Sequence, residues 1–240
     1  MGYSIVLCEG ETDQALIGCY LEKTNHWKYE KTKEGNLFPK ESINWFKDPR
    51  GMKKGIWAVG GDDFCSAVDK VFMREKQDHI IDKLVVVTDH DDQFAETDRV
   101  SMISETIKAR LSLSEELVLT VNNWSEISFT NSFGKVSMEA LYLLVPAEET
   151  GALETFMLDA LSEQNIDKEH VISESRRFVR EFKSESYLKH RRDKIKAELG
   201  VSMSVFNPDR VFTTMKELID SVDWSQFVVT HKQFGLLKSI

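Results

Sequence analysis

The feature that most constrains the fold is the apolar run Leu-Val-Val-Val at residues 84–87, within the longer segment 83–88. β-Branched side chains favour strands, and a strand that is apolar on both sides has to be covered on both faces. Two further apolar runs, at residues 4–8 and 55–59, are each followed by glycine and then by a helical pattern. Strands that alternate with helices predict an α/β fold with a mainly parallel central sheet flanked by helices.

The remaining segments extend this pattern and then change it. We expect helices at 64–72 and 100–111, strands at 117–121 and 138–146, and mostly loop with one irregular strand at 31–51. From residue 153 onward the pattern is helical, with helices at 153–161, one or two within 170–199, and another that Asn207 caps and Pro208 begins. The sequence therefore predicts an α/β domain at residues 1–125. Residues 126–240 form a C-terminal extension of one or two strands and then helices, packed on the same core.

Carboxylates gather where two of the apolar strands end. Glu9 and Asp13 follow the first strand, and Asp89, Asp91 and Asp92 follow the strand at 83–88. In parallel sheets ligands bind at the carboxyl ends of strands, and residues two apart on an extended segment point to one side. Sites made only of oxygen ligands suit Mg²⁺ or Mn²⁺ rather than zinc. We therefore predict a metal site of Glu9, Asp13, Asp89 and Asp91, with Asp92 as a supporting ligand.

A simpler interpretation of single residues stands beside this one. Acidic residues after strands are often helix caps, and Asp13 and Asp92 can serve only in that way. Neither a Glu-Gly turn nor an Asp-x-Asp triplet is specific alone. The combination is more specific than either motif: both occur after apolar strands, and a strand–Gly-Gly–helix unit separates them.

This combination resembles the Toprim domain of type IA and type II topoisomerases, bacterial primases, recombination mediators and OLD-family nucleases. Glu9-Gly10 matches the turn after the first strand of that family, Asp89-His90-Asp91 matches its D-x-D motif, and Gly60-Gly61 resembles its intervening glycine turn. The resemblance implies a compact Rossmann-like α/β fold, Mg²⁺ held by the D-x-D motif, and catalytic roles for Glu9, Asp89 and Asp91. The glutamate would be a metal ligand or a general acid/base.

The departures from the larger Toprim proteins are informative. The chain has no room for the tyrosine-bearing domain of a topoisomerase, its three unpaired cysteines cannot form the zinc ribbon of a primase, and it lacks the G-x-x-x-x-G-K-[ST] loop of an ATPase. Val145-Pro146, Gly151-x-Leu153-Glu154 and a basic helix at 189–199 look like a stand-alone bacterial Toprim family. A separate ATPase or defence protein would then be a partner.

Charge is unevenly distributed along the chain. The net charge is −9, yet residues 151–240 carry 14 basic and 14 acidic side chains, so the whole excess of acid lies before them. Residues 176–196 hold nine basic and three acidic side chains. Such a segment suits a phosphate track beside a metal site, or it is a solvated face. The candidate phosphate contacts are Arg191, Arg192, Lys194 and Lys196; Glu154 is a weaker candidate ligand, or a carboxylate favoured at a helix start.

These observations lead to three functional hypotheses. The first is a Mg²⁺- or Mn²⁺-dependent nuclease acting on DNA or RNA, in mobile-element or phage defence. The second is a non-catalytic Toprim module that binds nucleic acid or a partner protein, and the third is a small-molecule phosphohydrolase. Three cysteines without paired spacing favour the reducing cytoplasm, and the absence of an apolar run near ~20 residues speaks against a membrane span.

Overall fold

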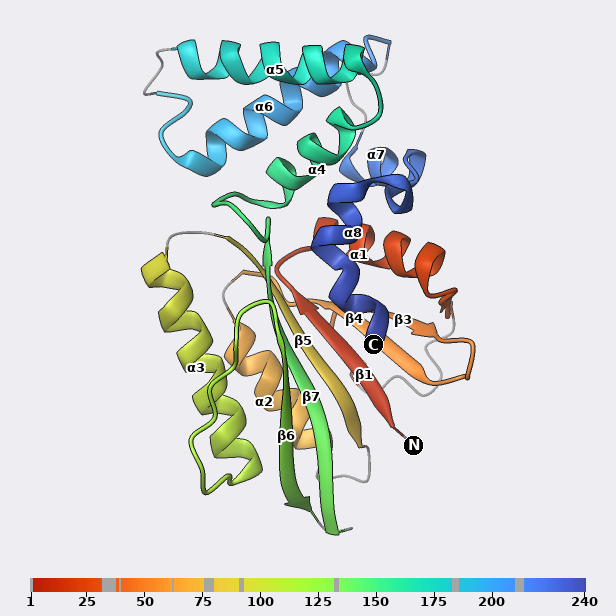
Figure 1. The fold of residues 1–240 in the computed structure, drawn as a ribbon, viewed down its shortest axis with the longest axis vertical. Coiled ribbons are helices and arrows are strands. Elements are labelled where there is room, and N and C mark those ends of the chain that lie inside the picture. The colour runs from red at the N-terminus through yellow and green to blue at the C-terminus, as the bar shows by residue number, and fades with distance from the viewer. Residues whose placement is uncertain are drawn as a thin grey trace.

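The structure is a computed structural model that describes residues 2–31, 38, 40–61, 63–75, 80–90, 93–131, 134–182, 186–209 and 214–240. Within these ranges one sheet of seven strands runs through the molecule in the order β2-β3-β4-β1-β5-β7-β6 (Figure 1). The strands are β1 (Tyr3–Cys8), β2 (Lys28–Tyr29), β3 (Ile43–Lys47), β4 (Lys53–Ala58), β5 (Ile81–Asp89), β6 (Trp124–Asn131) and β7 (Gly134–Val145).

The centre of the sheet is parallel. β1 pairs in parallel with β4 on one side and with β5 on the other, and β5 pairs in parallel with β7. The outer pairs β2–β3, β3–β4 and β6–β7 are antiparallel. The predicted Rossmann-like α/β fold is confirmed, because the three apolar runs that suggested it are the buried strands β1, β4 and β5.

Helices cover both faces of this sheet (Figure 1). Alternate residues of a strand point to opposite faces, so Val6 and Val85 face one core while Leu7 and Val86 face the other. The first core includes residues of α1, α4, α7 and α8; the second includes residues of α2 and α3. The helices are α1 (Glu11–Thr24), α2 (Phe64–Glu75), α3 (Gln93–Leu111), α4 (Leu153–Ser162), α5 (Ile166–Glu181), α6 (Arg191–Phe206), α7 (Met215–Ser221) and α8 (Val228–Phe234).

The strand order creates a switch point between β1 and β5. The chain passes from β1 to β4 on one side and then returns to β5 on the other side of β1. α1, which follows β1, packs on one face, whereas α3, which follows β5, packs on the opposite face. Connections that diverge in this way leave a crevice at the carboxyl ends of the two strands, the usual ligand position in such sheets.

The C-terminal helices stand beyond these strand ends. α4, α5 and α6 pack on one another at the top of Figure 1, above the carboxyl ends of the parallel strands. Trp224 and Phe227 are buried in the first core, and Trp124 packs against it from a half-buried position. In the described part of the chain, no helix is both long and apolar enough to cross a membrane.

Two sequence-based assignments are wrong. Residues 117–121 form no strand: the N–H of Leu119 donates to Ser104 Oγ (3.2 Å) rather than to a ladder, and only Val121 makes a bridge, to Tyr142. Asn207 does not begin a helix, because it closes α6 through its N–H to Met203 O (3.0 Å). The next helix, α7, starts at Met215 behind a Thr214 cap.

The C-terminal extension contributes to the same sheet. β6 and β7 both lie beyond residue 123, and β7 pairs with β5 while β6 forms an edge. The division at residue 125 stays a prediction about independent domains. The described sheet itself is continuous across that position.

Candidate metal centre

Glu9 is the first residue after β1, and a glycine turn lies beside it. The N–H of Gly60 donates to the backbone oxygen of Glu9 (3.0 Å), and Gly60 and Gly61 have φ values of 84° and 77°. Residues other than glycine rarely adopt such values, so this turn explains why two glycines follow β4. Gly10 needs no such freedom, because its φ of −142° is extended backbone that any residue adopts.

Asp13 lies in the first turn of α1, close to Glu9. Its Oδ2 accepts a hydrogen bond from the N–H of Gly10 (3.1 Å). Burial raises the pKa of Asp13 to about 7; the negative charge of Glu9 adds to this rise, and the Gly10 hydrogen bond opposes it. A carboxyl group in this state sits among other negative groups with too little water to solvate them all.

Asp89, the last residue of β5, connects three elements. Its N–H donates to Glu9 Oε1 (3.1 Å), and its Oδ1 accepts from the N–H of Leu153 (3.1 Å) at the start of α4. Burial raises the pKa of Asp89 to about 8, with further contributions from Glu9 and Asp13. The predicted meeting of Glu9, Asp13 and Asp89 at the carboxyl ends of β1 and β5 is therefore present.

Glu154 completes what we call the acidic edge: Glu9, Asp13, Asp89 and Glu154. Its charge raises the pKa of both Asp13 and Asp89. Glu154 also pairs with Lys196 of α6, at 3.5 Å between Oε1 and Nζ. The basic helix is thereby connected to the acidic edge, and its other candidate phosphate contacts, Arg191, Arg192 and Lys194, are exposed on α6. We call Arg191, Arg192, Lys194 and Lys196 the basic patch.

The donor set consists of carboxylate oxygens, which fits Mg²⁺ or Mn²⁺. Asp91 and Asp92, the other predicted ligands, lie outside the described residues. Within those that are described, no three His, Cys, Asp or Glu side chains are grouped as a ready-made metal site. The fit to a metal therefore rests on the chemistry and crowding of Glu9, Asp13 and Asp89.

Arg99 of α3 is a neighbour of the acidic edge that sequence reasoning missed. Its Nη1 lies 4.0 Å from Glu9 Oε1, and its side chain is largely buried. Arg99 also acts on Tyr142: burial raises the pKa of that hydroxyl, and the guanidinium opposes the rise. Tyr142 in turn is hydrogen bonded to Thr88 (2.9 Å), the residue before Asp89. Nothing in the sequence pattern indicates the contact between Arg99 and Glu9, since it depends on how α3 packs against the sheet.

His90, the residue after Asp89, makes three polar contacts with neighbouring elements. Its N–H donates to Val145 O (2.9 Å) and its Nδ1 lies 2.9 Å from Pro146 O. Its Nε2 stands 3.3 Å from Glu96 Oε1. These contacts fasten the end of β5 to the end of β7 and to α3, so His90 holds the strand end that carries Asp89.

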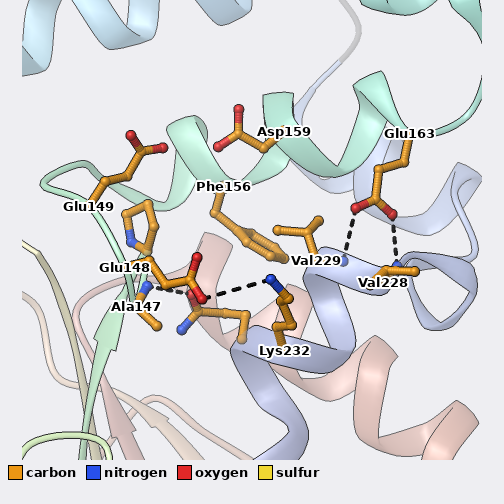
Figure 2. Close-up of a pocket in the computed structure, with 11 residues that line it drawn as sticks. Ala147, Glu148, Glu149, Phe156, Asp159, Glu163, Val228, Val229 and Lys232 are labelled. Atoms are coloured by element: carbon orange, nitrogen blue, oxygen red, sulfur yellow. Dashed lines mark hydrogen bonds and ion pairs between the residues drawn. The ribbon is translucent and has the colours of Figure 1, made fainter.

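A hollow of about 540 Å³ lies on the other side of α4, facing α8 (Figure 2). Glu163 accepts from the N–H groups of Val228 (2.7 Å) and Val229 (3.0 Å), and Lys232 lies 3.8 Å from Glu148. The Glu163 contacts join α8 to the end of α4, and the Lys232–Glu148 pair joins α8 to the segment between β7 and α4. The residues around the hollow therefore help to hold α4, the helix whose first N–H binds Asp89.

The sequence matches the family described as "Protein of unknown function (DUF3226)" over residues 3–231, and the chain belongs to that family. The comparison with curated proteins gave no match. Among solved structures, the chain is similar to a hypothetical protein from Pyrococcus horikoshii OT3, with 16% sequence identity and a TM-score of 0.50. That similarity covers 99% of this chain and 92% of the other. At this identity it supports the fold alone.

Proposed function

We propose that the acidic edge, together with Asp91, binds Mg²⁺ or Mn²⁺ and that the protein cleaves phosphodiester bonds of DNA or RNA. The observation that carries the proposal is the crowding of Glu9, Asp13 and Asp89 at the switch point of the sheet. Burial, and then the repulsion between these carboxylates, raises the pKa of Asp13 to about 7 and that of Asp89 to about 8. Perturbed carboxyl groups in a crevice are typical of functional sites, and a dication would neutralise them.

The groups around the edge suit a polyanionic substrate. A bound dication would activate a water molecule and stabilise charge on the phosphate oxygens. Arg99, 4.0 Å from Glu9, can hold that carboxylate in place and bring positive charge to the phosphate. The basic patch on α6, joined to the edge by the Lys196–Glu154 pair, can bind the phosphates that flank it.

The test is a cleavage assay on supercoiled plasmid, single-stranded DNA and RNA, each with Mg²⁺, Mn²⁺ or EDTA. We expect metal-dependent cleavage by the wild type and its loss in Asp89→Asn. The matched control is Asp82→Asn, because Asp82 lies on the same strand and burial also raises its pKa. Asp82→Asn is expected to cleave like the wild type. Metal-dependent cleavage that survives in Asp89→Asn would contradict the proposal.

One observation favours the second candidate, a non-catalytic module that binds nucleic acid or a partner protein. Asp13 and Asp89 each already accept a backbone hydrogen bond, and that of Asp89 anchors the start of α4. Binding of oligonucleotides through the basic patch, without cleavage under any metal condition, would favour this candidate. For either function, the resemblance to stand-alone Toprim proteins suggests a separate ATPase or defence protein as partner. The three cysteines without paired spacing suggest the cytoplasm as compartment.

A further inference from the structure

Helix α5 has a second side that its own chain leaves exposed. One side, with Ile172, Ser175 and Val179, is buried where α5 packs against α4 and α6. The other side lines a groove of about 460 Å³, whose opposite wall is Val201 and Val205 of α6. The groove residues of α5 recur at helical spacing. Ser175, which is buried, lines the floor of the groove. We call the other groove residues of α5 the α5 stripe: His170, Val171, Glu174, Arg177, Phe178 and Glu181.

The groove and its surroundings are unusually apolar for an exposed surface. Phe178 is 56% exposed and Val205 is 55% exposed. Phe182, 49% exposed, packs against Phe178 in a tilted arrangement with 5.8 Å between ring centroids. In Figure 1 α5 and α6 lie at the end of the molecule remote from the N-terminus, away from the sheet. Contiguous exposed apolar groups of this kind mark interaction surfaces.

The charges of the α5 stripe are complementary to a reversed copy of the same stripe. If two α5 helices pack antiparallel about a two-fold axis between Ser175 and Arg176, Glu174 of each copy stands level with Arg177 of the other. In the same register, His170 stands level with Glu181. At 1.5 Å of rise per residue, Val171 and Phe178 of opposite copies come within ~3 Å along the axis.

We propose that the α5 stripe is a homodimer interface in which the α5–α6 groove of each copy receives α5 of the other. A two-fold contact requires one patch to be complementary to itself, and the stripe meets this condition in both charge and apolar content. Glu174 and Arg177 also pair within one helix, so in the dimer they form a network of four charges. A polyanion is a poorer occupant, because Glu174 and Glu181 line the groove.

The test uses charge reversal and sedimentation velocity, in EDTA so that the metal proposal plays no part. The wild type is expected to dimerise reversibly. Glu174→Arg places arginine level with Arg177 of the other copy, and Arg177→Glu places two glutamates together. Because like charges opposed across an interface are strongly unfavourable, each variant should raise the dimer dissociation constant by about tenfold or more.

Mixing the two variants provides the decisive arm. In a heterodimer of Glu174→Arg with Arg177→Glu, both facing pairs are again of opposite charge, although neither chain regains its internal pair. We expect the mixture to dimerise while each variant alone stays monomeric. Glu169→Arg is the matched control, since Glu169 is exposed on α5 outside the stripe, and it should dimerise like the wild type. A monomeric wild type at every concentration, or a mixture that stays monomeric, would overturn the proposal.

Discussion

At the scale of single residues, Asp13 and Asp89 of the acidic edge keep protons that exposed aspartates have lost by neutral pH. The pKa of Asp89 is raised from 3.8 to about 8, and that of Asp13 from 3.8 to about 7. Between the ordinary pKa of 3.8 and these raised values, the folded protein binds more protons than the unfolded chain. The free energy of unfolding therefore falls as pH rises through this window, and it does not fall further above the folded pKa values.

This predicts a pH profile that can be measured by denaturant unfolding in EDTA. The wild type should lose stability between about pH 4 and pH 8, since each unit of pKa difference corresponds to about 1.4 kcal/mol. Asp89→Asn removes the group with the larger shift and relieves Asp13 of a neighbouring charge, so its profile should be flatter. Asp89→Asn and wild-type profiles of equal slope would show that these carboxyl groups titrate normally.

Glu9 gives a second prediction at this scale. Its Oε1 accepts the N–H of Asp89, and the amide oxygen of glutamine can accept the same bond. Glu9→Gln should therefore keep the fold, as judged by circular dichroism and thermal unfolding, while cleavage falls below detection. Unchanged plasmid cleavage would remove Glu9 from the catalytic site, and a variant that fails to fold would make it a structural residue.

At the scale of elements, a strand could be predicted from the sequence where its own apolar pattern determines its structure. β5 was predictable because its apolar run leaves no polar face. β6 was not predicted, although Ile127 and Phe129 point inward between exposed residues. The strand was assigned instead to the neighbouring apolar segment 117–121. That segment is held by Ser104 Oγ of α3, a tertiary contact that no local pattern indicates.

The same distinction applies to the site. Glu9 and Asp89 could be brought together from sequence, because each follows a buried strand and parallel strands end at one edge. Arg99 and the Leu153 N–H could not, since both come from helices whose packing on the sheet decides the contact. Asp91 was predicted on the same basis as Asp89 but lies outside the described residues.

Helix α6 carries the prediction that belongs to this scale. Replacing the whole basic patch with alanine should weaken binding to all oligonucleotides and flatten its salt dependence. Each lost phosphate contact lowers the slope of log affinity against log salt by about 0.9 on duplex DNA and about 0.7 on single strands. Fluorescence anisotropy across a salt series measures that slope.

A matched control separates the basic patch from general loss of positive charge. Four exposed lysines on other elements can be replaced together in the same way: Lys23, Lys28, Lys135 and Lys238. This control should keep most of the slope. Equal slopes for the patch variant and the wild type would mean that the α6 patch is a solvated face.

At the scale of the whole molecule, the sheet and the C-terminal helices build the acidic edge together. The strand order brings Glu9 and Asp89 to the switch point, and α4 closes it through the Leu153 N–H and Glu154. α6 then connects the edge to positive charge through Lys196. Residues from well-separated parts of the sequence thus lie together at one edge of the sheet, which is the arrangement that the proposed metal-dependent site needs.

The most direct test of this account is isothermal titration calorimetry with Mn²⁺ at pH 8. With pKa values of about 7 and about 8, Asp13 is then mostly ionised and Asp89 is half ionised. We expect the wild type and the control Asp82→Asn to bind Mn²⁺ with similar affinity, and Asp89→Asn to bind it much more weakly. Binding in the wild type should also weaken toward pH 6, because protons then compete for the same carboxylates. Equal Mn²⁺ affinity in the wild type and Asp89→Asn, or no Mn²⁺ binding by the wild type, would contradict the assignment of the acidic edge as a metal centre.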